Sequence, residues 1–488
     1  MLGNGVASSV PIEHDEILTL KNVRMEAELH PDGIKEVSNG RLALDFKDVI
    51  GVKREGARVI YVAYPKVVGT ATNCCVTGEE ARQRTETVFT CSTEEVARKW
   101  ETSTWGVLQR DFINRKGRHI RRFMVLLNPH SGKGLSEKIF NDHSLPMFRD
   151  AGIECTVIKT EYSGHASKLC NESNDLLEFD GIVIVSGDGL LFEVIQGLMS
   201  RPDWAKVVKT VALGVIPGGS GNGLAISLAD ASGEIKGPLS NSFLIAKGNI
   251  ASMDLCAVDH FGKGRVYSFL SLEFGFVADI DIGSEWMRSL GEVRFTLEAL
   301  LLLFSPKSTR CRLSYLPVAG SPLTPSIAPR VPSYWDSDGY DGSDGPKTTL
   351  TPPLSQRVGN DWVTIEDKFF FMWHCNVAHM SSSAHVSPHS KWDDGYLQLC
   401  FYRKTKSRMA RLNLLRFLLA LETGGHITDH GASIYPAIEM LPARAYRLEP
   451  LKKTGTRMAV DGELFELGPI QMEVLPGIML LMGAAATE

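Results

Sequence analysis

Long hydrophobic runs are absent from this chain of 488 residues, and its densest apolar segment, residues 299–304, is only six residues long. A membrane-spanning helix needs about 20 apolar residues. The first 16 residues also lack the basic and apolar regions of a secretory signal peptide, and their composition predicts disorder. The sequence therefore predicts a protein that is able to touch a membrane but does not cross one.

Paired cysteines and an excess of positive charge are also missing. No two of the nine cysteines have CxxC spacing, and their odd number does not suggest a disulfide framework. This pattern predicts a reducing, cytoplasmic location. The net charge of -5 argues against nucleic acid as a partner, because nucleic-acid binding normally needs a basic surface. The adjacent Cys74 and Cys75 are either reversible lipidation sites or a chance pair.

Residues 17–112 contain several short alternating strand patterns followed by a helical pattern. Ser92 and Glu95 have the spacing of a capping box at the start of that helix. Antiparallel strands closed by one helix resemble a pleckstrin-homology-like module. Such a module would dock on a membrane surface or on a protein, and a purely structural appendage is the alternative.

Residues 121–255 alternate strand and helix patterns, with strands expected at 123–128, 154–160, 181–187 and 211–218. This alternation predicts a doubly wound α/β domain. Because ligands bind at the carboxyl ends of parallel strands, the loops that follow these strands are expected to converge on one site.

The third of these strands ends in Ser186-Gly187-Asp188-Gly189. The glycines permit close approach of a ligand to the backbone, and an aspartate at this place suits a phosphoryl acceptor or a metal. A plain Asp-Gly turn with a helix cap is the structural alternative.

Two further glycine-rich loops follow strands, at residues 128–134 and 217–223. The first is not a P-loop, because Gly134 stands where Ser or Thr is required. The second opens a helix, and its backbone N–H groups are suited to hold a polyphosphate. Three such loops at successive strand ends predict a phosphate site.

The segments LLNPHSGKG, VSGDGLLFEVIQGLMSRPDW, IPGGSGNGLA, FVADIDIGSEWMRSLGEVRF and AVDGELFE are similar to signatures of the diacylglycerol-kinase catalytic superfamily, and among its members to sphingosine kinases. The resemblance covers about residues 121–315 and 360–470. It implies that Asp188 is the catalytic acid/base, that Ser186, Gly187 and Gly189 contact the substrate, and that Asp281 pairs with a substrate amine. The chain departs from the usual pattern at His130 and Trp286. The nucleotide contacts that the resemblance implies are Asn128, Pro129, His130, Thr160, Glu161, Tyr162, Ser163, Gly164, Glu193, Gly219, Ser220, Gly221, Arg288, Arg294, Asp461, Gly462 and Glu463.

The chemistry of phosphoryl transfer agrees with these residue types. Arg288 and Arg294 are able to bind phosphate oxygens in a bidentate manner. Mg²⁺ requires one or two carboxylates, and Asp461 is the expected ligand. Without the resemblance, a hairpin turn is the favoured interpretation of Asp461-Gly462.

Residues 256–488 are expected to form a mostly antiparallel, β-sandwich-like lipid-binding domain. The proline-rich stretch 316–361 is predicted to be a disordered insertion in it. The apolar helix at 411–423 is interpreted first as a core helix, with a lipid-tunnel wall or an interfacial surface as alternatives.

Together with the resemblance, these patterns predict a lipid kinase that uses ATP and Mg²⁺ to phosphorylate the primary hydroxyl of a sphingoid base. The expected location is cytoplasmic with peripheral membrane contact, and a homodimer is left open. The alternatives are a ceramide or diacylglycerol kinase, a catalytically silent lipid-binding protein, and a soluble sugar or NAD kinase. The acidic Asp281 favours an amine substrate.

Overall fold

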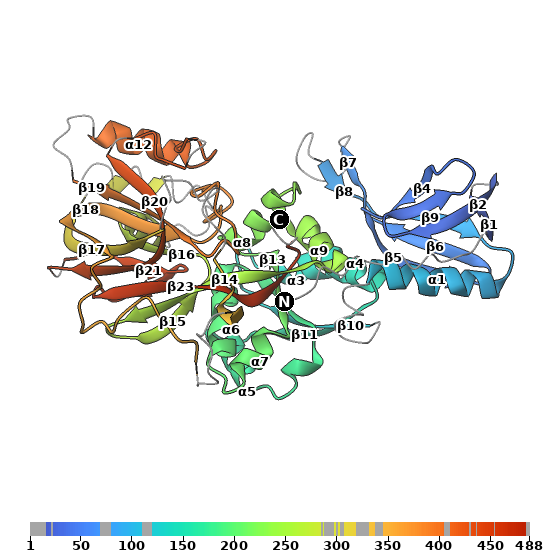
Figure 1. Ribbon diagram of the computed structural model, residues 1–488, viewed down its shortest axis with the longest axis horizontal. Helices are drawn as coiled ribbons and strands as arrows, with labels where there is room; N and C mark the ends of the chain where they lie inside the picture. Colours follow the sequence, from blue (N-terminus) through green and yellow to red (C-terminus); the bar gives the residue numbers. More distant parts are fainter. Residues whose placement is uncertain are drawn as a thin grey trace. The chain divides into compact units, whose positions relative to one another are not determined.

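The computed structural model divides the chain into two compact units (Figure 1). The first comprises Met1–Arg121, His143–Cys155 and Ser242–Gly248, and the second comprises the remaining residues. The residues that the structure describes are 16–20, 23–68, 80–109, 120–284, 286, 297–298, 301–302, 307–318, 331–336, 345–404, 410–428, 431–435, 437–452 and 454–484. Cys74 and Cys75 lie outside them.

The first unit contains a seven-stranded sheet in the order β4-β3-β2-β1-β9-β6-β5, in which all the recorded pairs are antiparallel. A separate two-stranded ribbon pairs β7 with β8. The strands are β1 (Glu16–Leu20), β2 (Val23–His30), β3 (Gly33–Glu36), β4 (Leu42–Asp45), β5 (Val49–Glu55), β6 (Arg58–Ala63), β7 (Lys66–Val68), β8 (Glu80–Arg82) and β9 (Thr85–Thr90).

A single long helix, α1 (Glu94–Leu108), follows these strands and buries Ala97 and Trp100 in their core. The expected strands and helix are therefore present, while the pleckstrin-homology-like assignment stays a prediction. The cap of the helix differs from the expected one. Thr93, not Ser92, is the N-cap residue, and its Oγ1 accepts a hydrogen bond from the N–H of Val96. Either hydroxyl has suitable chemistry, and the backbone conformation decides which one caps the helix.

The segment His143–Cys155 packs into the same unit. The hydroxyl of Tyr64 donates to Asp150 Oδ2 at 2.8 Å, and Arg84 Nε donates to the same oxygen at 2.6 Å. Gly51 faces the carbonyl of Asp150 so closely that a Cβ would lie 1.8 Å from it. This segment contains all of α4 (Leu145–Asp150) and the start of β11 (Ile153–Lys159), so part of the expected α/β domain belongs to the first unit.

The second unit begins its sheet with parallel strands. β12 (Gly181–Ser186) pairs in parallel with β10 (Arg121–Leu127) on one side and with β13 (Ala212–Pro217) on the other, and β11 flanks β10. The connecting elements of this α/β region are α3 (Ser136–Ile139), the π-helix Phe140–Ser144, α5 (His165–Glu172), the 3₁₀ helix Leu176–Glu178, α6 (Asp188–Met199), α7 (Trp204–Val208), α8 (Gly223–Ala231) and α9 (Pro238–Lys247).

The final strand of the chain joins this parallel region. β23 (Ile470–Met482) runs parallel to β13, with Leu213 opposite Leu481, and antiparallel to β14 (Ile250–His260) and β20 (Ile438–Pro450). A 14-stranded sheet therefore connects the α/β region with the later strands (Figure 1). Strand β14 passes through the expected domain boundary at residue 255.

The later strands pair antiparallel, as the sequence predicts. Their buried side chains form one hydrophobic cluster, and a second, larger cluster joins Leu126 and Ile184 of the parallel strands to Trp373. The remaining elements are β15 (Gly264–Ser268), β16 (Ser271–Gly275), α10 (Phe276–Gly283), β17 (Thr309–Pro317), the 3₁₀ helix Tyr334–Asp336, β18 (Val363–Cys375), β19 (Leu397–Arg403), α12 (Ala410–Ala420), β21 (Met458–Val460) and β22 (Glu463–Phe465).

Two pieces of the predicted disordered insertion make defined contacts. The ring of Trp335 stacks on Trp204 with centroids 5.6 Å apart. Farther on, the N–H groups of residues 349–351 and the hydroxyl of Thr351 donate to the carboxylate of Glu473. These pieces differ from the disorder that their composition predicts, because a buried carboxylate and an aromatic surface elsewhere in the chain hold them.

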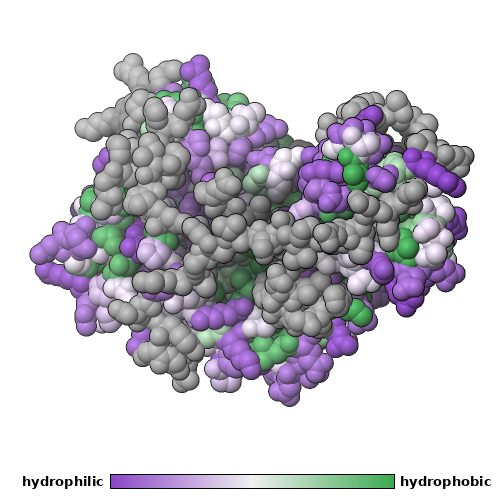
Figure 2. All heavy atoms as spheres, turned by 45° about the vertical axis from the view of Figure 1, so that its right-hand side comes forward, coloured by the Kyte–Doolittle hydropathy of each residue, from purple (hydrophilic) through white to green (hydrophobic). Residues whose placement is uncertain are grey.

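Among the described residues, no helix is both long and apolar enough to span a membrane. On the face drawn in Figure 2, hydrophobic residues occur as scattered patches among hydrophilic ones.

Candidate functional site

The loops after the parallel strands meet, as the sequence predicts. Ser186, the last residue of β12, donates its hydroxyl proton to Ser131 Oγ of the first loop at 3.0 Å. The N–H of Gly218 in the third loop donates to the carbonyl of Ser186 at 2.9 Å. Parallel strands thus bring segments that lie about 30 to 90 residues apart in sequence to one edge of the sheet.

Glycine is required where these loops touch. A Cβ on Gly219 would lie 2.4 Å from the Cα of Gly187, and a Cβ on Gly132 would lie 2.8 Å from the carbonyl oxygen of Gly218. Gly132 also has a φ of 53°, which favours glycine. Backbone meets backbone here, so a side chain would force the loops apart.

Asn222 closes the third loop. Its side-chain oxygen accepts from the N–H of Gly219 at 3.0 Å, and its amide group donates to the carbonyl of Gly219 at 2.9 Å. Asn222 has a φ of 76°, a left-handed conformation that asparagine tolerates better than most residues. The N–H of Gly219 is therefore committed to the loop itself, which leaves the following N–H groups as the candidate phosphate donors.

Asp188 begins α6 and points toward the third loop. The N–H of Gly223, the first residue of α8, donates to Asp188 Oδ2 at 2.8 Å. Removal from water raises the pKa of Asp188 to about 6, even though backbone N–H groups of residues 222–224 favour the ionised form. At neutral pH Asp188 is thus mostly ionised, yet much closer to titration than an ordinary aspartate.

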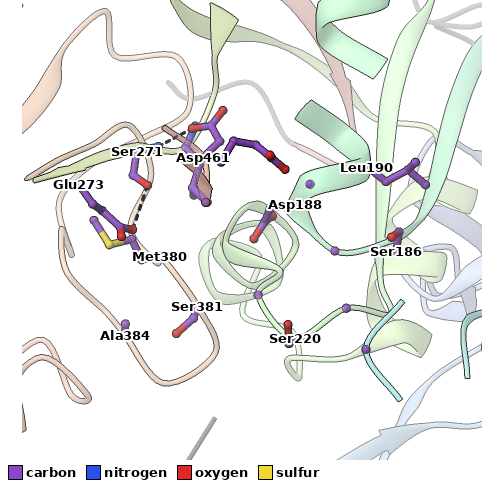
Figure 3. Close-up of a pocket in the computed structure, with 18 of the residues that line it drawn as sticks. Ser186, Asp188, Leu190, Ser220, Ser271, Glu273, Met380, Ser381, Ala384 and Asp461 are labelled. Atoms are coloured by element: carbon purple, nitrogen blue, oxygen red, sulfur yellow. Dashed lines mark hydrogen bonds between the residues drawn. The ribbon is translucent and has the colours of Figure 1, made fainter. Parts of the chain in front are cut away.

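One cavity of about 1160 Å³ contains this carboxylate. In Figure 3, Asp188 lies between Glu273 and Met380 on one side and Ser186 and Ser220 on the other. Many of the residues expected from the sequence line this cavity: Asn128, His130, Thr160, Glu161, Tyr162, Ser163, Ser186, Gly187, Asp188, Gly189, Glu193, Gly219, Ser220, Gly221, Asp461, Gly462 and Glu463.

Other expected residues are placed differently. Pro129 and Gly164 belong to the loops but are not among the lining residues. Asp281 lies in α10, and its side chain is outside the described part of the structure. Arg288 and Arg294 also fall outside the described residues. Trp286, one of the two departures from the family pattern, is 76% exposed.

Helix α12 supplies much of the apolar lining. Phe417 stacks on Phe371 and Trp373 of β18, so one face of the helix belongs to the core. Leu415 and Leu418 face the cavity. The helix is therefore a core helix, as first interpreted, that also borders the cavity, while its roles as a lipid-tunnel wall or an interfacial surface stay predictions.

Sequence reasoning missed several lining residues. Ser271 and Glu273 alternate on β16 and both reach the cavity, where the hydroxyl of Ser271 donates to Glu273 Oε1 at 3.5 Å (Figure 3). Alternation on a strand was the available signal, but the sequence does not show which face is buried. The other missed lining residues are Ser131, Gly132, Leu190, Leu270, Val277, Ile280, Trp373, Met380, Ser381, Ser383, Ala384, Val386, Leu415, Leu418, Leu419, Leu421 and Glu422.

Asp461 is held by several donors. Its Oδ1 accepts from the hydroxyl of Ser268 at 2.7 Å and from the N–H groups of Leu270 and Ser271, while its Oδ2 accepts from the N–H of Phe269. Burial raises its pKa to about 6, against the effect of these donors. The arrangement does not fit the expected role of a direct Mg²⁺ ligand, because hydrogen bonds occupy most of the lone pairs. It fits a carboxylate that orders the turn between β15 and β16.

Two family models match the chain. The model described as "Diacylglycerol kinase catalytic domain" matches residues 122–258. The model described as "YegS C-terminal NAD kinase beta sandwich-like domain" matches residues 352–483. Both matches lie on segments that contribute residues to the cavity.

Curated relatives are similar over most of the chain. Human sphingosine kinase 2 is 32% identical, with 74% of this chain and 71% of the relative covered. Human sphingosine kinase 1 is 35% identical, with 73% and 89% covered. Sphingoid long chain base kinase 4 of Schizosaccharomyces pombe is 32% identical, with 73% of each chain covered.

Among solved structures, a putative diacylglycerol kinase from Bacillus anthracis is 17% identical, with 74% of this chain and 94% of that chain covered and a TM-score of 0.49.

Proposed function

Because this chain belongs to the sphingosine kinase family of lipid kinases, we propose that it transfers the γ-phosphate of ATP to the primary hydroxyl of a sphingoid base. The observation that carries this proposal is the single cavity that joins glycine-rich loops to leucine side chains, with Asp188 between them. A polyphosphate and a lipid chain need these two environments, and a transfer reaction needs them to meet.

Asp188 is the proposed acid/base of the reaction. The substrate hydroxyl donates a hydrogen bond to the ionised carboxylate, which orients the oxygen toward the transferred phosphorus. As the new O–P bond forms and the bond to the leaving ADP oxygen breaks, Asp188 accepts the hydroxyl proton. Its pKa of about 6 supports this role, because it is closer to neutral pH than that of an ordinary aspartate. The transition state is loose, so positioning contributes more than proton removal.

The proposed nucleotide site consists of the loop residues that line the cavity. Among the described residues, the N–H groups of Ser220 and Gly221 have no hydrogen-bond partner, and they precede the N-terminus of α8. Such N–H groups favour phosphate oxygens. Tyr162 stacks on His165 with ring centroids 4.6 Å apart, and the residue is 54% exposed and lines the cavity, which suits contact with a nucleobase.

The proposed lipid site uses the apolar lining from α10, β18 and α12. Burial of each methylene contributes about 0.8 kcal/mol before the costs of binding. Tail burial therefore supplies affinity but does not identify the headgroup. We assign that task to Asp281, which would pair with the substrate ammonium, and to Ser271 and Glu273, two polar residues of the cavity lining.

Mg²⁺ bound with ATP would neutralise phosphate charge during transfer. The hydrogen bonds of Asp461 leave it poorly suited as a direct ligand, so no step is assigned to a metal on that residue. We also propose peripheral contact with the membrane that holds the lipid substrate. The exposed Leu419, which lines the cavity and is 60% exposed, supports such a contact.

The testing experiment measures phosphate transfer from labelled ATP to sphingoid bases, ceramide and diacylglycerol in mixed micelles. We expect labelling of the free bases. Asp188→Asn should lower kcat by about 10² to 10⁴-fold, because it removes the proton acceptor. Asp281→Asn should weaken base binding far more than ATP binding.

Other outcomes would point to other functions. Preferential labelling of ceramide or diacylglycerol would keep the phosphate site and overturn the role of Asp281. Absence of transfer to every lipid, with ATP still bound, would indicate a catalytically silent lipid-binding protein.

A further inference from the structure

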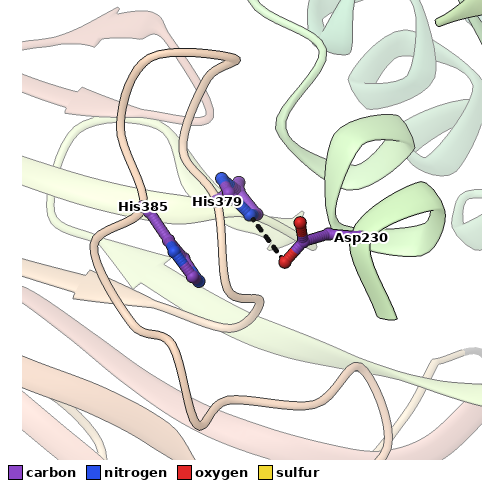
Figure 4. A group of neighbouring side chains, drawn as sticks. All are labelled: Asp230, His379 and His385. Carbon is purple, nitrogen blue, oxygen red and sulfur yellow. Dashed lines mark ion pairs between the residues drawn. The ribbon is translucent and has the colours of Figure 1, made fainter. Parts of the chain in front are cut away.

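Three side chains of types that bind metals in other proteins gather beside the cavity wall. Asp230 lies near the end of α8, and His379 and His385 lie on the segment that follows β18 (Figure 4). One ligand atom from each residue lies within 4.8 Å of the others. None of these residues lines the cavity or has a role in the proposed reaction.

Each of the two imidazole rings has a nitrogen without a hydrogen-bond partner in the part of the chain that the structure describes. The side chain of His379 is only 1% exposed. Among the described residues, neither His379 Nδ1 nor His385 Nε2 has a hydrogen-bond partner. The rings stack face to face, with centroids 4.0 Å apart and an interplanar angle of 8°. Leaving such polar atoms unsatisfied is costly, so a ligand that uses them would be favoured.

One carboxylate and one ammonium lie beside the two imidazoles. His379 Nε2 lies 3.2 Å from Asp230 Oδ2, and Lys236 Nζ lies 3.2 Å from Asp230 Oδ1. A neutral imidazole nitrogen offers a lone pair to a metal ion. Lys236 is thus the competitor that a metal ion has to displace from the carboxylate.

We propose that Asp230, His379 and His385 form a structural site for a divalent transition-metal ion of the zinc class. Two imidazole nitrogens and one carboxylate oxygen are ligands that Zn²⁺ accepts, whereas Mg²⁺ prefers oxygen ligands. Ligand atoms at about 2.0–2.2 Å from a tetrahedral ion lie roughly 3.3–3.6 Å apart. The lone pair of an imidazole lies in the plane of its ring, so the two rings have to turn out of their stacked arrangement before both nitrogens face one ion. Water occupies the fourth position.

The metal would hold the segment 379–385 against α8. Two contacts already join this segment to α8 and to the residue before it. The N–H of His379 donates to Ser227 Oγ at 3.0 Å, and Ser381 pairs with Asn222 in an isolated bridge. A Cβ on Gly223 would lie 2.6 Å from the carbonyl oxygen of His379. The same segment places Met380, Ser381 and Ala384 in the cavity lining. The site therefore stabilises one wall of the cavity, and this inference does not depend on which lipid binds there.

The test is a Zn²⁺ titration of the chelator-treated full-length protein, followed by calorimetry and by thermal unfolding. We expect one high-affinity site and a rise in Tm with Zn²⁺. Asp230→Asn and His385→Gln should each weaken the binding at least tenfold, and Mg²⁺ should not compete at equal concentration. His389→Gln is the matched control, because this neighbouring histidine is outside the group. It should bind Zn²⁺ as the native protein does.

A variant that is expected to raise the Zn²⁺ affinity distinguishes a metal site from an ordinary ion-pair cluster. Lys236→Met removes the competing ammonium, so Zn²⁺ should bind several-fold more tightly, although the metal-free protein loses an ion pair. Metal-free Tm values identify any variant that fails to fold. The proposal is overturned if the native protein shows no stoichiometric Zn²⁺ site, or if Asp230→Asn and His385→Gln bind as the native protein does. It is also overturned if Lys236→Met leaves the affinity unchanged.

Discussion

Asp188 illustrates how its surroundings tune a single carboxylate. Removal from water raises its pKa from 3.8 to about 6, while three backbone N–H groups limit the shift. Because only the ionised form accepts a proton, the rate should fall as the pH drops through about 6. At pH 5 we expect about one-tenth of the plateau value of kcat, measured with saturating ATP and base.

The same shift affects stability with a defined sign. Between pH 3.8 and about 6 the folded protein holds a proton on Asp188 that the unfolded chain has released, so rising pH lowers the free energy of unfolding in this range. Asp188→Asn should remove this contribution, as urea unfolding at several pH values would show.

A kcat that stays at its plateau value down to pH 5 would contradict the assignment of Asp188 as the base.

Gly221 is a glycine at which an added side chain would meet Asp188 itself. A Cβ at this position would lie 2.8 Å from Asp188 Oδ2. Gly221→Ala should therefore displace the carboxylate and reduce kcat by about tenfold or more, since small misplacements are costly in catalysis. Gly237→Ala is the control, because a Cβ there meets nothing within 4 Å. It should leave both kcat and Tm unchanged, and equal effects of the two changes would contradict the prediction.

We expect Asp461 to stabilise the fold and not to bind Mg²⁺ directly. Asp461→Asn keeps a side chain that tolerates the φ of 49° at this position, but it replaces one acceptor oxygen by a donor group. We expect a loss of about 1.5–3 kcal/mol in the free energy of unfolding, the typical value of a hydrogen bond to a charged group. The Mg²⁺ concentration that gives half-maximal rate should not change. Unchanged stability with a tenfold higher Mg²⁺ requirement would instead identify a direct metal ligand.

At the scale of elements, α12 has two apolar faces with different tasks. Phe417 packs on β18, whereas Leu418 lines the cavity. Leu418→Trp should shorten the space for the lipid tail, so that KM rises steeply for long-chain bases and shorter bases become preferred. Each excluded methylene is worth about 0.8 kcal/mol, or roughly fourfold in affinity. Nucleotide binding should be unaffected.

Leu412 provides the matched control on the same helix. It is 39% exposed and does not line the cavity, so Leu412→Trp should leave the chain-length preference as it is. If both changes alter the preference equally, the helix acts on lipid access in general and its face toward the cavity has no special role.

At the scale of the whole molecule, β23 connects regions that are far apart in sequence. It pairs with β13, β14 and β20 but contributes no residue to the cavity. A chain that ends at residue 469 should therefore lose both the cooperative unfolding transition of the second unit and its nucleotide binding. Removal of residues 485–488 alone is the control and should change neither. A truncated chain that still binds ATP and melts cooperatively would show that the parallel strands fold without β23.

The sequence by itself determined the secondary-structure elements and the loops at the ends of the parallel strands, because these depend on neighbouring residues. The alternation of strands and helices, the three glycine-rich loops and the place of Asp188 at the end of β12 follow from side-chain periodicity and from the backbone freedom of glycine. The convergence of the loops also follows, because the carboxyl ends of parallel strands share one edge.

Only the tertiary structure decided which distant residues meet. Several features join segments that lie tens to hundreds of residues apart. They are the return of β23 to the parallel strands, the donors around Asp461, the cavity-facing side of β16 and the meeting of Asp230 with His379 and His385. Sequence periodicity reports which face of an element is apolar but not which partner covers it. Those partners are selected by packing and by the need to satisfy buried polar groups across the whole chain.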